Sequence, residues 1–257
     1  MGIEVALLSG TELRLALGGG DVVIGRLDVL PTLDGVEAGL FDLLLVEHAG
    51  VRVVNSARSL VAAHDKLVTA RRLARAGLPH PRTELGRSGK ASSLRPPVVV
   101  KPRFGSWGKD VFRCETRAEL ARVLRAVSDR SWYRRHGALV QELVPTSGVD
   151  LRLVIAGGTV IGAVERIAAP GEWRTNVALG GSVRSVDPPP QACALALAAA
   201  AALGCDFVGV DLLPVGPAGF VVLELNGAVE FREPYSLAGR SLYEDLARAL
   251  RLQAGRA

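Results

Sequence analysis

The 257-residue sequence is poor in cysteine. Its three cysteines, Cys114, Cys193 and Cys205, are far apart, and no two of them form a Cys-x-x-Cys pair. An odd number at this spacing argues against a disulfide framework and against a cysteine-ligated zinc site. We therefore expect the three thiols to be small core residues.

A long hydrophobic segment is also missing. Residues Met1 to Glu4 contain no basic cluster and lead into a short apolar run, unlike a secretory signal peptide. The longest apolar run, Ala192 to Leu203, is mostly alanine and too short to span a bilayer. These absences predict a cytoplasmic protein without a membrane partner.

No block of one charge forms a basic or acidic tail. The chain has 31 Lys and Arg against 26 Asp and Glu, a net charge of +5 and a pI of about 9.5. The basic excess favours anionic ligands, but it comes from arginines spread along the chain. Nucleic-acid binding is therefore the weakest interpretation, and it would predict strongly salt-dependent association.

The composition is that of a globular chain, with 49% hydrophobic and 22% charged residues. This length can form one to three small domains. Apolar spacing predicts a mixed α/β (α+β) protein, with a polar, mobile loop at 168–182. The expected strands are 3–8, 13–17, 22–30, 51–54, 98–101, 111–114, 138–143, 150–155, 159–167, 207–213 and 220–225. The expected helices begin near residue 55, at the Thr116–Glu119 capping box, after Asp187 and near Leu242.

The segment 98–112, "VVVKPRFGSWGKDVF", joins two apolar strands through a glycine loop. It departs from the Walker pattern, because only two residues separate Gly105 from Gly108 and Asp110 stands where that pattern has Ser or Thr. A glycine turn between antiparallel strands can instead close over phosphates through backbone N–H groups, with Lys101 reaching the phosphates or the base. Taken alone, the segment fits an ordinary hairpin turn equally well.

Three polar side chains interrupt the apolar carboxyl-terminal hairpin. Asp211 lies in "GVDLL", and Glu224 and Asn226 share one face of "LELN" because they are two residues apart. Two carboxylates and an amide form a hard-oxygen set that Mg²⁺ accepts, with phosphates and waters completing the octahedron. The alternative is a solvated strand face, and the position of the acids inside strongly apolar strands argues against it.

A weaker indication comes from "LVQELV", residues 139–144. A strand that leads into a Gln-Glu pair and an apolar hinge can supply the backbone donor and acceptor that read an adenine edge.

Together these segments resemble the ATP-grasp superfamily, and within it the RimK-like carboxylate–amine ligases. The resemblance covers most of residues 55–226, in the family's order. It implies two α+β subdomains that clasp ATP: 61–141 with the glycine flap, and 142–257 with the metal site. Residues 1–60 would be a shortened amino-terminal domain, and its poor match leaves open whether it completes the substrate pocket. The matching segments are "AHDKLVTARRLARAGLPHPRT", "VVVKPRFGSWGKDV", "LVQELV", "DLRLVIAGGTVIGAVER", "EWRTN", "GVDLL" and "LELN".

The resemblance also implies a role for each matching side chain. The ATP-binding residues would be Lys66, Lys101, the flap residues Gly105, Ser106 and Gly108, the adenine-hinge residues Gln141, Glu142 and Leu143, the ribose-binding Asp150, and the loop residues Arg174 and Asn176. The metal ligands would be Asp211, a bridging Glu224 and Asn226. The catalytic residues would be Arg152 and Arg166, which contact the acyl phosphate or substrate carboxylate, together with Arg174.

The implied activity is ATP-dependent amide formation through an acyl phosphate, with ATP as co-substrate and two Mg²⁺ ions, or Mn²⁺ in their place. Phosphoryl transfer needs positioning and charge neutralisation more than acid–base groups. The lack of a visible Ser-His-Asp or Cys-His arrangement is therefore expected. The runner-up functions are an ATP-grasp phosphotransferase (a kinase) and a non-catalytic nucleotide-binding module.

The tail "ELNGAVEF", residues 224–231, resembles ligases that join an amino acid to the terminal glutamate of a small acidic carrier protein in amino-acid biosynthesis. The rival is an α-L-glutamate ligase that adds glutamate to a protein tail or a cofactor. The basic charge suits an acidic partner. Both readings imply an amino acid such as glutamate as a partner, and only the resemblance implies a homo-oligomer.

Overall fold

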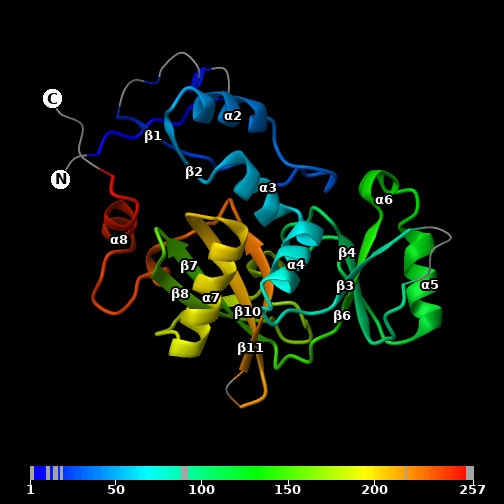
Figure 1. Ribbon diagram of the computed structural model, residues 1–257. Helices are drawn as coiled ribbons and strands as arrows, with labels where there is room; N and C mark the ends of the chain where they lie inside the picture. The colour runs from blue at the N-terminus through cyan, green and yellow to red at the C-terminus, as the bar shows by residue number, and fades with distance from the viewer. Residues whose placement is uncertain are drawn as a thin grey trace.

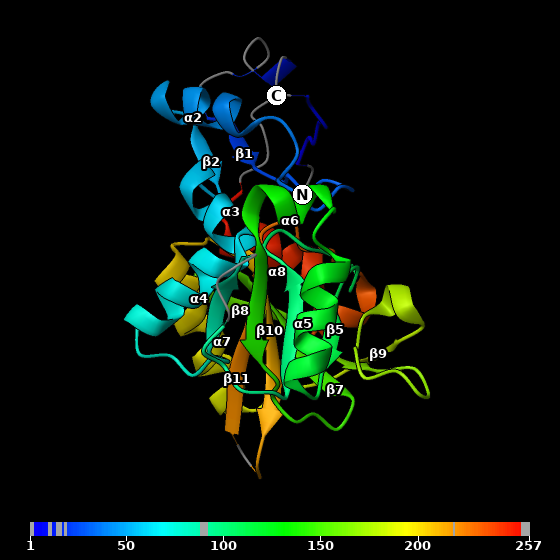
Figure 2. The same cartoon turned by 90° about the vertical axis from the view of Figure 1, so that its right-hand side faces the viewer.

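The computed structural model describes residues 3–9, 12–13, 17, 20–87, 92–217 and 219–252. Its elements form a small amino-terminal unit and two antiparallel sheets that lie beside each other (Figure 1). Figure 2 shows the same arrangement from the side, with the amino-terminal unit above both sheets. No helix in the described ranges is long and apolar enough to cross a membrane.

The amino-terminal unit contains less strand than the sequence predicts. β1 (Val22–Ile24) pairs in parallel with β2 (Arg52–Val54), and α2 (Leu40–His48) lies between them in the chain. The strand expected at 3–8 is wrong: this stretch is irregular, and Leu7 is fully exposed. A strand needs a paired neighbour, and apolar spacing alone cannot supply one. The expected strand at 22–30 stops at Ile24, and most of the one at 13–17 lies outside the described residues.

The helix expected from residue 55 to Gly77 is two helices, α3 (Ala57–His64) and α4 (Lys66–Arg75). The break falls at Asp65, whose carboxylate accepts hydrogen bonds from the N–H groups of Leu67 and Val68 at 3.1 and 3.3 Å. Because an Asp in this position caps a new helix, Lys66 becomes the first residue of α4.

The smaller sheet has the strand order β3-β6-β4-β5. Its core includes Val98, Val100, Cys114 and Val140, against which Leu120 of α5 packs. The predicted hairpin at 98–114 and the capping box at Thr116 are confirmed. The elements are β3 (Thr83–Gly86), β4 (Val98–Pro102), β5 (Phe112–Cys114), α5 (Arg117–Ala126), α6 (Ser131–His136) and β6 (Ala138–Glu142).

The larger sheet has the order β11-β10-β7-β8-β9 and a helix on each face. Leu153 of β7 packs against α7, whereas Val154 packs with Leu242 of α8, so alternate residues serve opposite faces. The predicted hairpins and the alanine-rich helix are confirmed. The elements are β7 (Val149–Ala156), β8 (Thr159–Ile167), η1 (Val177–Leu179), β9 (Ser182–Ser185), α7 (Pro190–Leu203), β10 (Phe207–Val215), β11 (Gly219–Asn226), η2 (Glu233–Tyr235) and α8 (Leu242–Ala249).

Helix α4 contacts both β3 and β11, so it joins the two sheets. The predicted domain division stays a prediction, with its first boundary inside α3 and its second at the last residue of β6.

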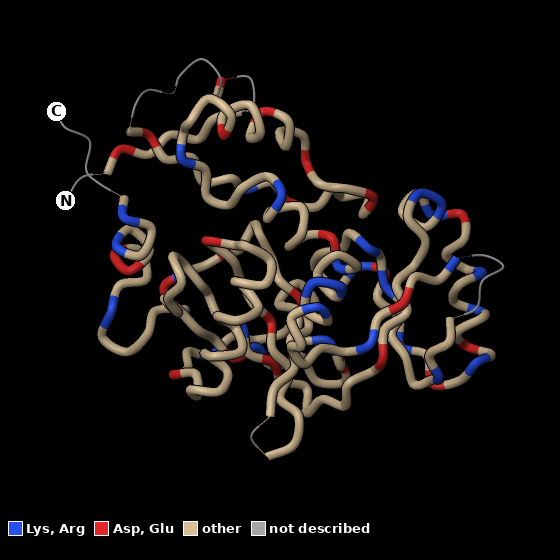
Figure 3. The backbone as a smooth tube through the Cα atoms, in the orientation of Figure 1, with Lys and Arg blue, Asp and Glu red and all other residues tan. Residues whose placement is uncertain are grey.

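The basic residues are less evenly spread than the sequence analysis assumed. Residues 66–135 hold 18 of the 31 Lys and Arg but only 5 of the 26 Asp and Glu. They lie on α4 and around the smaller sheet, as the blue segments of Figure 3 show. One half of the molecule is therefore cationic, although the chain as a whole is only moderately basic.

Candidate nucleotide and metal site

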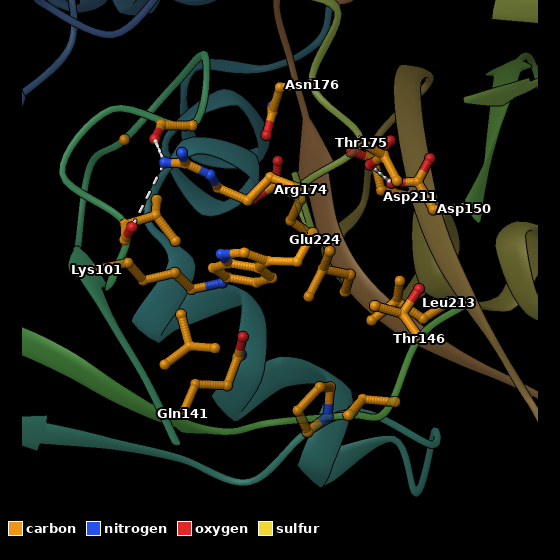
Figure 4. A pocket seen from close by; sticks show the side chains of 18 of the residues that line it. Lys101, Gln141, Thr146, Asp150, Arg174, Thr175, Asn176, Asp211, Leu213 and Glu224 are labelled. Atoms are coloured by element: carbon orange, nitrogen blue, oxygen red, sulfur yellow. Dashed lines mark hydrogen bonds between the residues drawn. The ribbon is translucent and has the colours of Figure 1, made fainter. Parts of the chain in front are cut away.

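A deep cavity lies between the two sheets and encloses about 900 Å³ of unfilled space, its open mouth included. Figure 4 shows Lys101, Gln141 and Arg174 on one side of it, and Asp150, Thr175 and Asp211 on the other. We call it the nucleotide cavity. Of the sixteen predicted site residues, fourteen line it: Lys66, Lys101, Gly105, Ser106, Gly108, Gln141, Glu142, Leu143, Asp150, Arg166, Arg174, Asn176, Asp211 and Glu224.

The remaining two predicted residues, Arg152 and Asn226, line a neighbouring cavity that shares a wall with the first. The structure therefore gathers residues from α4, both sheets and the 168–182 loop around one space, although up to 160 positions separate them in the sequence.

The glycine flap is the turn between β4 and β5. Trp107 and Gly108 have positive φ angles of 61° and 69°, and a Cβ atom on Gly108 would lie 2.8 Å from the side-chain oxygen of Asn176. The Arg174 guanidinium donates to the Gly108 carbonyl at 2.9 Å. The 168–182 loop thus lies directly against the flap, and a side chain at position 108 would force the Asn176 and Leu179 side chains to shift.

Lys101 is 6% exposed and lies at the end of β4. Burial, together with the nearby Lys66, lowers the pKa of its ammonium group to about 8, although Glu224 and Asp211 act in the opposite direction. The Lys66 ammonium donates to the Gly105 carbonyl at 2.6 Å. Two cations beside the flap form a region that favours phosphate.

The predicted adenine hinge is arranged differently from expectation. The Glu142 N–H donates to the Arg82 carbonyl at 2.9 Å, and the Leu143 N–H donates to the Pro97 carbonyl at 3.2 Å. Both N–H groups are thus already bonded, because they continue the pairing of β6 with the segments that precede β3 and β4 on its two sides. Apolar side chains, including Val99, Val144, Leu213 and Leu223, line this part of the cavity and provide surfaces against which a base can pack.

Asp211 lies opposite Glu224 in the antiparallel register of β10 and β11 and is almost fully buried. Arg152 donates two hydrogen bonds to its carboxylate, at 2.6 and 2.7 Å, and Arg166 donates a third at 2.7 Å. Burial alone would raise the pKa of Asp211, but the two guanidinium groups outweigh it and lower the pKa to about 2.

Asp150, predicted to bind ribose, is bonded within the protein. Arg166 donates to both of its oxygens, at 2.7 and 2.6 Å, and the Thr175 hydroxyl donates at 2.5 Å. Burial raises the pKa of Asp150, and Arg166 opposes that shift. Asp150 therefore anchors both Arg166 and the 168–182 loop.

Glu224 lies 3.3 Å from the Lys66 ammonium. Burial would raise its pKa, but Lys66 reverses the effect and the pKa is lowered. Asn226, two residues on, accepts a hydrogen bond from the Ala228 N–H at 3.0 Å through its side-chain oxygen.

The donor set fits Mg²⁺. Asp211 and Glu224 are neighbours across the strand pair, Asn226 follows on the same face of β11, and all three offer hard oxygen ligands. The described residues contain no cluster of three or more His, Cys, Asp or Glu suited to a metal. The proposed ligand set has two carboxylates, those of Asp211 and Glu224. Substrate phosphates are therefore needed to complete the coordination of a cation.

Sequence reasoning missed Trp173 and Thr175, which also line the nucleotide cavity. The signal was present, since both flank Arg174 in the quoted "EWRTN" segment. It also missed Asp65, whose carboxylate holds the Arg103 guanidinium at the base of the flap.

Comparison with known proteins agrees with this geometry. Residues 63–249 match the RimK-like ATP-grasp domain family. A probable alpha-L-glutamate ligase of Thioalkalivibrio sulfidiphilus is 35% identical over 92% of this chain and 80% of its own length. The glutamate–LysW ligase ArgX of Sulfurisphaera tokodaii is 32% identical over 75% of this chain and 70% of its own. The crystal structure of a RimK domain ATP-grasp protein from Sphaerobacter thermophilus superposes with a TM-score of 0.62 at 23% identity, covering 92% of this chain and 83% of that one.

Proposed function

This chain belongs to the RimK-like ATP-grasp family of ATP-dependent amide-forming ligases, and on that premise we propose that it joins the amino group of L-glutamate to a carboxylate carried by a protein or a cofactor. The observation that carries the proposal is the nucleotide cavity itself. Buried Lys101 and the glycine flap face the paired carboxylates Asp211 and Glu224 across one space. ATP and Mg²⁺ serve ligases of this kind.

Different side chains have different roles in phosphoryl transfer. Lys66, Lys101 and the flap hold the phosphates, and Arg174 fixes the 168–182 loop against the flap. The transferred γ-phosphoryl group joins an oxygen of the acceptor carboxylate, which becomes an acyl phosphate while ADP leaves. Bound Mg²⁺ would be held by Asp211, Glu224 and Asn226 and would neutralise charge on the phosphates.

Amide formation follows phosphoryl transfer in the same site. The ammonium group of the amino acid first loses a proton, and the resulting amine attacks the acyl carbon. The C–N bond forms, the bond from that carbon to the phosphate oxygen breaks, phosphate leaves, and the new amide nitrogen loses its second proton. Arg166 lines both cavities, and Arg152 lines the neighbouring one. Their guanidinium groups are placed to stabilise the negative charge that develops on the acyl oxygens.

We further propose that Asp211, Glu224 and Asn226 would hold two Mg²⁺ ions, or Mn²⁺ in their place. An acidic acceptor suits this chain, because residues 66–135 are strongly cationic. The S. tokodaii relative is named for the protein LysW, and the T. sulfidiphilus relative for glutamate alone. A small acidic carrier protein, and a protein tail or a cofactor, are therefore the two acceptor classes to test.

The test is an ADP-release assay with ATP, Mg²⁺, L-glutamate and a panel of acceptors, followed by mass spectrometry of each acceptor. The proposal expects ADP release that needs both glutamate and acceptor, together with a glutamyl adduct on the acceptor. Phosphorylated acceptor without an amide, in the presence of glutamate, would replace the ligase with a phosphotransferase.

A further inference from the structure

A second cavity, which we call the outer cavity, adjoins the nucleotide cavity and encloses about 1210 Å³ of unfilled space, its mouth included. The two cavities share Lys66, the flap residues Gly105 to Trp107, Arg166, Asn176 and Glu224. The outer cavity therefore opens onto the flap and Glu224, where the proposed function places the reacting phosphate.

The amino-terminal unit closes one side of the outer cavity with Asp28 and Val29. Several contacts fix this segment: the Asp28 N–H donates to Glu37 at 3.0 Å, and Val29 bridges to Val36. The Leu27 backbone is hydrogen-bonded to His64, whose electrostatic neighbours also include Asp28 and Glu224. The Asp28 carboxylate accepts a hydrogen bond from the Val29 N–H at 2.6 Å, lines the same cavity as Glu224, and forms no ion pair with a described residue.

Two arginines, Arg152 and Arg232, also line the cavity, together with buried Tyr235, which lies near Arg152. The Arg152 guanidinium is bound to Asp211, whereas Arg232 has no ion-pair partner among the described residues. Asp28 and Arg232 are therefore a carboxylate and a guanidinium from two distant parts of the chain that line one cavity without an ion-pair partner among the described residues; the Glu230 carboxylate, which also lines it, has none either.

This pair of opposite charges suits one class of ligand. An acidic peptide would bring carboxylates alone, which Asp28 and the nearby Glu230 would repel. A free α-amino acid carries both an ammonium and a carboxylate group. We propose that the outer cavity binds the amine substrate as a free amino acid, with its ammonium group on Asp28 and its α-carboxylate on Arg232. The inference rests on the proposed ligase function and assigns residues outside the nucleotide and metal sites.

Three probe molecules distinguish the contribution of the ligand's ammonium group to binding from that of its α-carboxylate. L-glutamate has every group, glutarate lacks the ammonium group, and γ-aminobutyrate lacks the α-carboxylate. Each would be titrated calorimetrically into the full chain with Mg²⁺ and a non-hydrolysable ATP analogue. Hydrogen bonds between charged groups are typically worth a factor of about 10 in affinity.

We expect Asp28→Asn to weaken L-glutamate and γ-aminobutyrate about 10-fold and to leave glutarate unchanged. Arg232→Gln should weaken L-glutamate and glutarate to a similar degree and leave γ-aminobutyrate unchanged. Matched controls are Asp187→Asn and Arg248→Gln, because both residues are exposed and line neither cavity. Affinity for the ATP analogue should stay constant in all four variants.

Equal effects of one variant on all three probes, or no effect on any, would overturn the assignment. If glutamate is ligated to an acceptor while both variants keep wild-type affinity for it, the inference fails and the ligase function stands. If the probes behave as expected but no acceptor receives glutamate, the cavity assignment stands and the ligase function fails.

Discussion

The guanidinium group of Arg166 joins two buried carboxylates: one nitrogen donates to Asp150 at 2.6 Å and to Asp211 at 2.7 Å. Asp211 belongs to the metal-ligand set, and Asp150 holds Thr175 of the 168–182 loop. Arg166 therefore connects the expected metal site with the loop that contacts the flap.

Removing Arg166 leaves two buried carboxylates without their shared cation. We expect Arg166→Met to lower the free energy of unfolding by about 3–5 kcal/mol, the usual cost of breaking a buried ion pair from one side. Urea denaturation would measure the loss. Arg248→Met provides the control, since the Arg248 side chain is 72% exposed and its pair with Asp245 should contribute at most about 1 kcal/mol. If Arg166→Met lowers the free energy of unfolding no more than the small amount expected for Arg248→Met, the buried network contributes little to stability.

The lowered pKa of Lys101 predicts a pH-dependent affinity for nucleotide. Below the pKa of about 8 the ammonium group is charged and binds phosphate, and above it the free protein must first take up a proton. The dissociation constant for an ATP analogue should therefore rise as pH increases from about 8 towards the ordinary lysine value. The measurement is calorimetric titration across this range.

Lys101→Met is the matched variant for this prediction. It should bind the analogue more weakly at pH 7, and its affinity should change little between pH 8 and pH 10. A wild type and a variant with parallel pH profiles would assign the dependence to another group.

The sequence predicts the larger sheet and the flap hairpin well, because their signals are local. Alternating apolar residues around Gly157 and Gly158 specify the β7–β8 hairpin, and residues 98–114 specify the β4–β5 hairpin. The short helices α2 and α6 and the edge strands β3 and β9 were not predicted. Such short elements depend on packing against distant segments, which periodicity does not report.

The sequence predicted which residues gather around the two cavities, but it did not predict the bonds among them, and the roles of these residues stay predictions. The motifs identify Asp150, Arg152 and Arg166, yet the pairing of Arg152 with Asp211 arises from strand register between β7 and β10. The sequence also could not predict that Asp28 lines the outer cavity, because the amino-terminal unit carries no motif and its position depends on contacts with α3.

Gly108 is expected to be essential for contact between the flap and the loop. In Gly108→Ala the new methyl group would lie 2.8 Å from the Asn176 side-chain oxygen and 2.9 Å from Leu179, so both side chains must shift and the contact between flap and loop is disturbed. We expect about 10-fold weaker binding of an ATP analogue, roughly 1.4 kcal/mol, and faster proteolysis within 168–182. Gly216→Ala is a sharp control: its φ of 60° imposes the same backbone cost, but a Cβ there meets nothing within 4 Å. Equal effects in the two variants would point to backbone strain as the cause.

If Asp211, Glu224 and Asn226 bind Mg²⁺, the metal should affect the thermal stability of the nucleotide complex. A ligand present at 100 times its dissociation constant stabilises a protein by about 2.7 kcal/mol, which for a chain of this size raises Tm by roughly 2–4 °C per kcal/mol. ADP with Mg²⁺ should thus raise Tm by several degrees, and ADP without Mg²⁺ by less. Glu224→Gln should keep the shift caused by ADP alone and lose the increment caused by Mg²⁺, because one of the two carboxylates is then neutral. A full Mg²⁺ increment in this variant would remove Glu224 from the ligand set and leave Asp211 as its only carboxylate.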